Sequence, residues 1–111
     1  MLEEFELYLN KQIKEEEEKL ENSLNFNNEL TAKKNNASLY QLKFIKASYE
    51  SMSVDSFKSM LGKMDDILDE EIDSYLDITN NISKDEYYIC STIKKAVLGQ
   101  IITEFNKINV D

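Results

Sequence analysis

Proline is absent from this chain of 111 residues, and glycine occurs only twice. Proline removes a backbone hydrogen bond from a helix and glycine loosens one, so their scarcity leaves long stretches free to be helical. Apolar residues make up 41% of the chain and recur at spacings of three, four and seven, which is the repeat of one helix face. The sequence therefore predicts an all-α fold in a single helical domain over residues 1–111, and it disfavours a β-sandwich.

The apolar repeat divides the chain into four predicted helices. The first runs from residue 2 to about residue 30, and the polar residues 32–37 are expected to form the first loop. A short second helix follows over residues 39–52. Ser53 is a residue type that caps helices, and it marks the start of a third helix that should end near Asn80.

The fourth predicted helix has the most regular apolar spacing in the chain. Its residues Ile93, Val97 and Ile101 share one face, and we expect them to form the centre of the core. Four helices with connections of a few residues predict a four-helix bundle with an up-and-down, antiparallel arrangement.

Histidine and arginine are both missing. All thirteen basic residues are lysine, and the 22 acidic residues give a net charge of −9. Without histidine the chain lacks the usual general base and the nitrogen ligands of zinc and di-iron sites. Without arginine it lacks the side chain that reads guanine and clamps phosphates with two hydrogen bonds. We therefore expect no enzyme activity, no metal or other cofactor, and no direct contact with nucleic acid.

Three features bear on cellular location. No apolar run approaches the roughly 18 residues that a membrane-spanning helix requires. The residues after Met1 are acidic, whereas a signal peptide begins with basic residues. The lone Cys90 fits a reducing compartment. We expect no membrane association and a cytoplasmic location, which is the host cytoplasm if a mobile element encodes the protein.

A stripe of carboxylates is the most specific feature of the third predicted helix. Residues 65–77 carry seven acidic side chains and no basic one. Four of them fall within an arc of about 60° and repeat every ~5–6 Å along the helix, close to the phosphate spacing of one nucleic-acid strand. These four are Asp66, Glu70, Asp73 and Asp77, and Asp69 lies beside them. They are the candidate contacts for a protein with a basic surface.

The second predicted helix is the basic one, with Lys33, Lys34, Lys43 and Lys46 and no acid over residues 30–49. These lysines could contact acidic helices of the same chain or of a second copy, or only offset local repulsion.

Two aromatic residues also mark this segment. Tyr40 and Phe44 lie one helical turn apart, opposite its apolar face, so they are either covered by a second core face or available to a partner. A strand over residues 38–46 is the alternative to a helix, because the apolar residues Tyr40, Leu42 and Phe44 alternate with polar ones along the chain.

Three charged residues occupy positions where the apolar stripes predict core. They are Glu16, Glu71 and Lys94. Either Lys94 joins the two carboxylates in a buried polar layer, or bending of the helices and the length of the side chains bring the charges to water.

These features favour a binding function. We expect a small acidic protein-binding module, an inhibitor or adaptor that imitates DNA and occupies the basic groove of a nucleic-acid-handling enzyme, as proteins of mobile elements do. Tyr40 and Phe44 would supply apolar anchors. The alternative is a structural bundle that forms a homodimer or a larger homo-oligomer and whose acidity keeps it in solution.

Two carboxylate patterns leave room for an enzyme. Residues 65–69 match the aspartate-rich pattern that holds magnesium and diphosphate in isoprenoid synthases, which are far larger proteins. Glu15 with Glu18, and Glu70 with Asp73, resemble the paired Glu-x-x-Glu and Glu-x-x-Asp of the all-α nucleotide pyrophosphohydrolases. This second resemblance implies a four-helix core with Mg²⁺ bound by carboxylates of facing helices, although here a long segment separates the two pairs.

Overall fold

Four helices make up the part of the chain that the structure describes. The computed structural model describes residues 3–76 and 82–109, and no strand occurs among them. The helices are α1 (Glu3–Asn25), α2 (Glu29–Ser51), α3 (Val54–Leu76) and α4 (Ile82–Ile108). The predicted all-α helical bundle is confirmed, and the strand alternative for residues 38–46 is wrong because this segment is helical throughout.

The second helix is not short, and the first loop lies earlier than predicted. The chain turns at residues 26–28, where Asn27 adopts a positive φ of 55° and the Asn28 side chain accepts a hydrogen bond from the Thr31 backbone N–H over 3.2 Å. Asparagine suits both roles, because it tolerates the left-handed conformation and caps helices. The polar segment 32–37 is helical because Ala32 and Ala37 are buried while the polar side chains between them lie further out.

The start of α3 agrees with the prediction. The Ser53 hydroxyl accepts a hydrogen bond from the Ser56 backbone N–H over 3.2 Å, so Ser53 caps this helix. Only Met52 and Ser53 separate α2 from α3.

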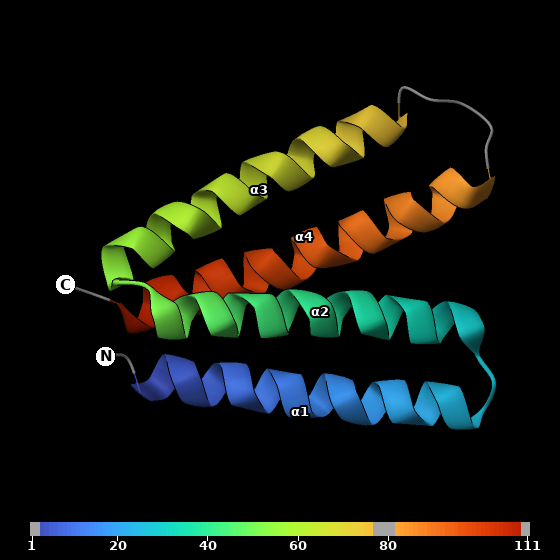
Figure 1. Ribbon diagram of the computed structural model, residues 1–111, viewed down its shortest axis with the longest axis horizontal. Helices are drawn as coiled ribbons and strands as arrows, with labels where there is room; N and C mark the ends of the chain where they lie inside the picture. Colours follow the sequence, from blue (N-terminus) through green and yellow to red (C-terminus); the bar gives the residue numbers. More distant parts are fainter. Residues whose placement is uncertain (1–2, 77–81, 110–111) are drawn as a thin grey trace.

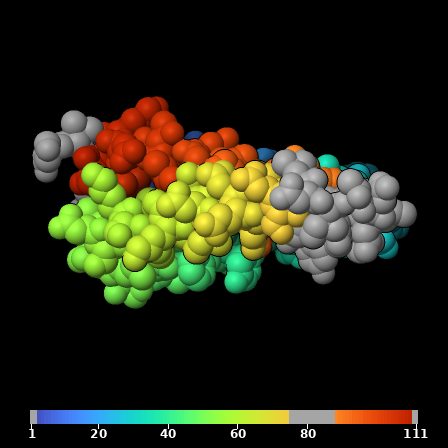
Figure 2. Space-filling model, turned by 90° about the horizontal axis from the view of Figure 1, so that it is seen from above, coloured from blue at the N-terminus to red at the C-terminus, as the bar shows by residue number. Residues whose placement is uncertain are grey.

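The helices form two hairpins, α1 with α2 and α3 with α4, and α2 packs along α4 to join them. Figure 1 shows the hairpins close together at the end that holds both chain termini and the α2–α3 connection, and α3 diverging from α2 toward the opposite end. Figure 2 shows α3 running across one face, with parts of α4 and α2 on either side of it. None of the helices in residues 3–76 and 82–109 is long and apolar enough to cross a membrane.

An aromatic cluster forms the core where the hairpins meet. Each helix contributes one ring: Phe5, Tyr49, Phe57 and Phe105. Ring centroids lie 5.1–5.7 Å apart with edge-to-face angles, the geometry that aromatic quadrupoles favour. All four side chains are buried.

The core of α4 lies on a slightly different face from the one predicted. Leu98, Ile101 and Phe105 are buried, whereas Ile93 and Val97 are only partly covered. The prediction was therefore right for Ile101 and wrong for Ile93 and Val97. Leu98 belongs to the buried face because α4 is covered by α2 on one side and α3 on another, which widens its buried arc.

Candidate interaction surfaces

The outer face of α3 is acidic and exposed. Asp66, Glu70 and Asp73 are all exposed, while Phe57, Leu61 and Leu68 are buried on the opposite side of the helix. These three carboxylates form no ion pair with another described residue. Asp77, the fourth predicted member of the stripe, lies outside the described residues.

Asp69 has a different role from the rest of the predicted stripe. The Lys95 ammonium group of α4 binds the carboxylates of both Asp69 and Asp65, the latter over 3.3 Å. The hydrogen bond to Asp69, together with the bond and charge of Asp65, raises the pKa of Lys95 above its ordinary value of 10.5. This contact stabilises the fold below pH 10.5 and is lost as pH rises through the raised pKa. Asp69 therefore joins α3 to α4, and only part of it remains available to a partner.

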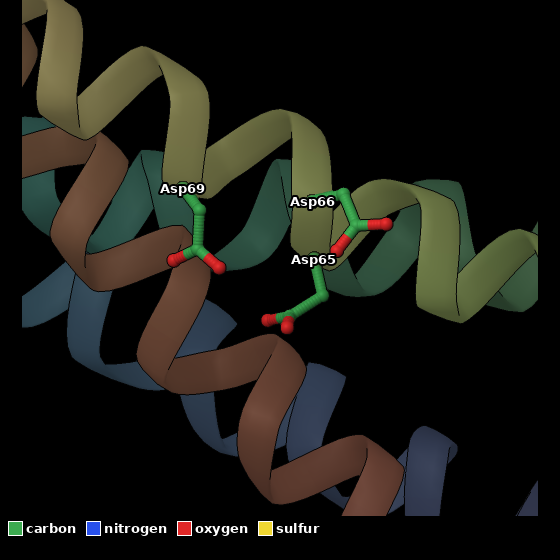
Figure 3. A group of neighbouring side chains, drawn as sticks. All are labelled: Asp65, Asp66 and Asp69. Atoms are coloured by element: carbon green, nitrogen blue, oxygen red, sulfur yellow. The ribbon is translucent and has the colours of Figure 1, made fainter.

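The same region holds a cluster of three carboxylates, shown in Figure 3. One carboxylate oxygen from each of Asp65, Asp66 and Asp69 lies within 4.8 Å of the others. Such a cluster suits a hard cation. However, the Lys95 ammonium group already supplies a positive charge to two of its three members.

We expect Mg²⁺ to change the melting temperature only slightly. Lys95 already supplies one positive charge to Asp65 and Asp69, so Mg²⁺ would have to displace this ammonium group and also give up part of its own tightly held water shell. Differential scanning calorimetry with increasing MgCl₂ should show a gradual shift that an equal ionic strength of NaCl reproduces. A saturable shift of several degrees that is specific to Mg²⁺ and lost in Asp66→Asn would show instead that the cluster binds metal.

The structure does not gather the carboxylates that resemble those of the pyrophosphohydrolases. Glu15 and Glu18 on α1, and Glu70 and Asp73 on α3, are all exposed. Among the described residues α1 and α3 meet through the rings of Phe5 and Phe57, but they do not pack along their lengths, where α2 and α4 lie between them. A shared metal site requires facing helices, so the arrangement gives this resemblance no geometric support.

The predicted aromatic pair on α2 is exposed. Tyr40 keeps 63% and Phe44 46% of its surface in contact with solvent. The ammonium group of Lys94 lies over the Tyr40 ring, 5.2 Å from its centroid, a cation–π contact between α4 and α2. Tyr40 and Phe44 are therefore not a second core face, and they lie together on the surface as a partner-binding site would require.

The three charged residues at predicted core positions do not form one buried layer. Glu71 is exposed and accepts a hydrogen bond from the Ser91 hydroxyl over 3.3 Å. Glu16 is partly exposed and lies 3.5 Å from the Lys19 ammonium group, while Lys94 contacts Tyr40. Long side chains thus carry each charge to a local partner at the surface.

Sequence reasoning missed two features of α4. Lys95 follows Lys94 directly, yet the first reaches α3 and the second reaches α2. An open groove of 510 Å³ also lies between α1 and α4, lined by Tyr8, Gln12, Gly99, Gln100, Thr103 and Glu104. Burial and then the nearby carboxylates of Glu104 and Glu15 raise the pKa of Tyr8. Neither feature can be predicted from the residue pattern of a single helix, because each depends on which helices become neighbours.

Comparison with known proteins gives no relative. No protein-family model, curated protein or solved structure matches the chain.

Proposed function

We propose that this protein is an acidic binding module that occupies a basic groove of a nucleic-acid-handling protein by imitating a phosphate strand. The observation that supports this function most is the outer face of α3, where Asp66, Glu70 and Asp73 are exposed and lie on one side of the helix. Their spacing of about one helical turn is near that of successive phosphates. The partner is a protein, because a surface of this charge repels nucleic acid itself.

An up-and-down order of the helices would favour this role. The connections at residues 26–28 and 52–53 are too short to carry the chain back along the bundle, so they suit antiparallel neighbours. In such a bundle α3 has one side in the core and the other available along its length. Its buried side, with Phe57, Leu61 and Leu68, fixes the rotation of the helix and so the direction of the carboxylates.

Long-range attraction would determine how fast the complex forms. A net charge of −9 directs the protein toward basic surfaces, and this effect weakens beyond a Debye length of about 8 Å at physiological salt. Apolar contacts would then slow dissociation. In a host cell's cytoplasm, a module of this kind would inhibit its partner by excluding nucleic acid, or would serve as an adaptor.

The experiment compares two variants that remove the same number of charges. Asp66→Asn/Glu70→Gln/Asp73→Asn changes only the proposed surface, while Glu3→Gln/Glu4→Gln/Glu21→Gln removes three exposed carboxylates from α1. Both should fold, as circular dichroism can check, because no altered side chain is buried. Immobilised parent protein should capture from an extract of the source cells a protein that added duplex DNA displaces. With that purified protein, the α3 variant should associate at least about tenfold more slowly and the α1 variant nearly as fast as the parent.

Two results would contradict the proposal. One is equal association rates for the α3 variant and the parent. The other is a captured protein that nucleic acid does not displace and that the double variant Tyr40→Ala/Phe44→Ala no longer binds. The second result would show that the aromatic face of α2 is the partner-binding surface and that the acidic face is only solvated.

A further inference from the structure

The outer face of α2 combines exposed aromatic rings with positive charge. Tyr40, Lys43 and Phe44 lie within one helical turn and are all exposed, and Lys33 is exposed two turns earlier. Residues 30–49 include no acidic side chain. Exposed aromatic residues of this kind dominate binding energy where a partner covers them, so the face is suited to a partner that is both acidic and apolar.

Lys94 adds a positive charge at the border of this face. Its ammonium group covers one side of the Tyr40 ring, which orients the ring and leaves its other parts in solvent, where 63% of the residue's surface is exposed. A ring held in place loses less conformational entropy when a partner packs against it.

The complementary surface is present on the same chain. The exposed side of α3 carries the carboxylates of Asp66 and Glu70, and Ile67, which keeps 57% of its surface exposed, lies beside them. Lys63 is also exposed one turn before Ile67, so this side holds one basic residue and is acidic on balance, whereas the face of α2 is basic around two aromatic residues. Within one molecule the two faces cannot meet, because both point outward from helices whose opposite sides form the core.

We propose that two copies of this chain pair through these faces, with α2 of each copy lying on α3 of the other. A pairing of α2 with α2 would oppose lysines, and a pairing of α3 with α3 would oppose carboxylates, so charge selects the mixed contact. A two-fold axis uses the mixed contact twice and leaves neither face unpaired, which closes the assembly as a dimer. Tyr40, Phe44 and Ile67 lose contact with water in this dimer, and the local charge pairs oppose the repulsion between two chains of net charge −9.

This inference does not rest on the proposed function, although the two are linked. Self-pairing covers the acidic face of α3, so a second copy and a basic partner would compete for it. The α2 face of the second copy would then keep the acidic face covered until the partner displaces it.

The first experiment is sedimentation equilibrium of the purified protein over about a hundredfold range of concentration. The parent should change from monomer to dimer and form no larger species. Tyr40→Ala/Phe44→Ala should dissociate at least about tenfold more readily, because it removes the aromatic contact twice per dimer. The matched control is Leu7→Ala on α1, which removes another exposed apolar side chain, 68% exposed, and should dimerise like the parent.

The second experiment tests which helices meet, by reversing charges. Lys33→Glu/Lys43→Glu makes α2 acidic and Asp66→Lys/Glu70→Lys makes the outer side of α3 basic. Each variant alone opposes like charges at both contacts of its dimer and should stay monomeric. Mixed in equal amounts, the two variants should form a heterodimer. One of its contacts joins the unchanged α2 of one variant to the unchanged α3 of the other, and the second contact joins the acidic α2 to the basic α3. Lys11→Glu/Lys14→Glu on α1 has the same net charge as the α2 variant, alters exposed residues only, and should still dimerise.

Several results would overturn the inference. They are a parent protein that is monomeric at every concentration, a double aromatic variant that dimerises like the parent, and charge-reversed variants that fail to pair when mixed. These measurements use the purified chain alone, so they can fail while the complex with a basic partner is still found. Conversely, a dimer that forms as expected would stand even if no such partner is captured.

Discussion

Replacing Phe57 by alanine is expected to destabilise the fold by about 3–5 kcal/mol, a large part of the 5–15 kcal/mol that holds a domain of this size together. Phe57 is fully buried near the start of α3, and its ring contacts those of Phe5, Tyr49 and Phe105, one from each other helix. Its removal would leave a cavity at the place where the two hairpins meet. Because α3 diverges from α2 beyond this point, few other contacts could close that cavity.

Chemical denaturation followed by circular dichroism measures this cost, with Phe26→Ala as the matched control. The control deletes the same ring from residues 26–28, where Phe26 keeps 83% of its surface exposed, so its cost should stay within about 0.5 kcal/mol. If both substitutions had similar small effects, the aromatic cluster would not be the centre of stability. If Phe57→Ala does not fold at all, Phe57→Leu should recover much of the stability, because leucine fills most of the same space.

The fold class could be predicted because it depends on local pattern. The absence of proline and the helical repeat act within each segment, and Ser53 caps α3 through a bond to a residue three positions later. The first loop could not be placed as well, because residues 32–37 are polar and still helical. What ends α1 is the pair Asn27 and Asn28, and what keeps residues 32–37 helical is burial of Ala32 and Ala37. Such burial depends on tertiary contacts that polarity alone does not indicate.

The candidate surfaces also include some features that follow from local sequence pattern and others that depend on tertiary contacts. The exposure of Asp66, Glu70 and Asp73 follows from which side of α3 is apolar, and the structure has all three exposed. For Tyr40 and Phe44 the helix pattern left a second core face and an exposed surface as alternatives, and the structure has both residues exposed. The ion pair between Lys95 and Asp69 depends on how α4 is rotated against α3. The contact of Lys94 with Tyr40 depends on how α4 packs against α2. Helix spacing within a single segment has no information about either contact.

The last expected result separates the observed core of α4 from the one predicted by spacing. Leu98 is fully buried and was not in the predicted stripe, whereas Ile93 was predicted to be central and is only partly covered. Leu98→Ala should cost about 2–4 kcal/mol, since it removes a buried side chain and leaves a cavity. Ile93→Ala should cost roughly 1 kcal/mol or less, because water already reaches part of the side chain and alanine favours the helix more than a β-branched residue does.

Denaturant titrations of the two variants under identical conditions decide between these cores, provided that both unfold with the slope of the parent and so remain two-state. Ile101→Ala supplies an internal reference, because Ile101 belongs to both the predicted and the observed core and should cost about as much as Leu98→Ala. A larger cost for Ile93→Ala than for Leu98→Ala would mean that α4 is rotated in solution toward the face that its spacing predicts. That rotation would also move Lys94 and Lys95, and with them the contacts that α4 makes to Tyr40 and Asp69.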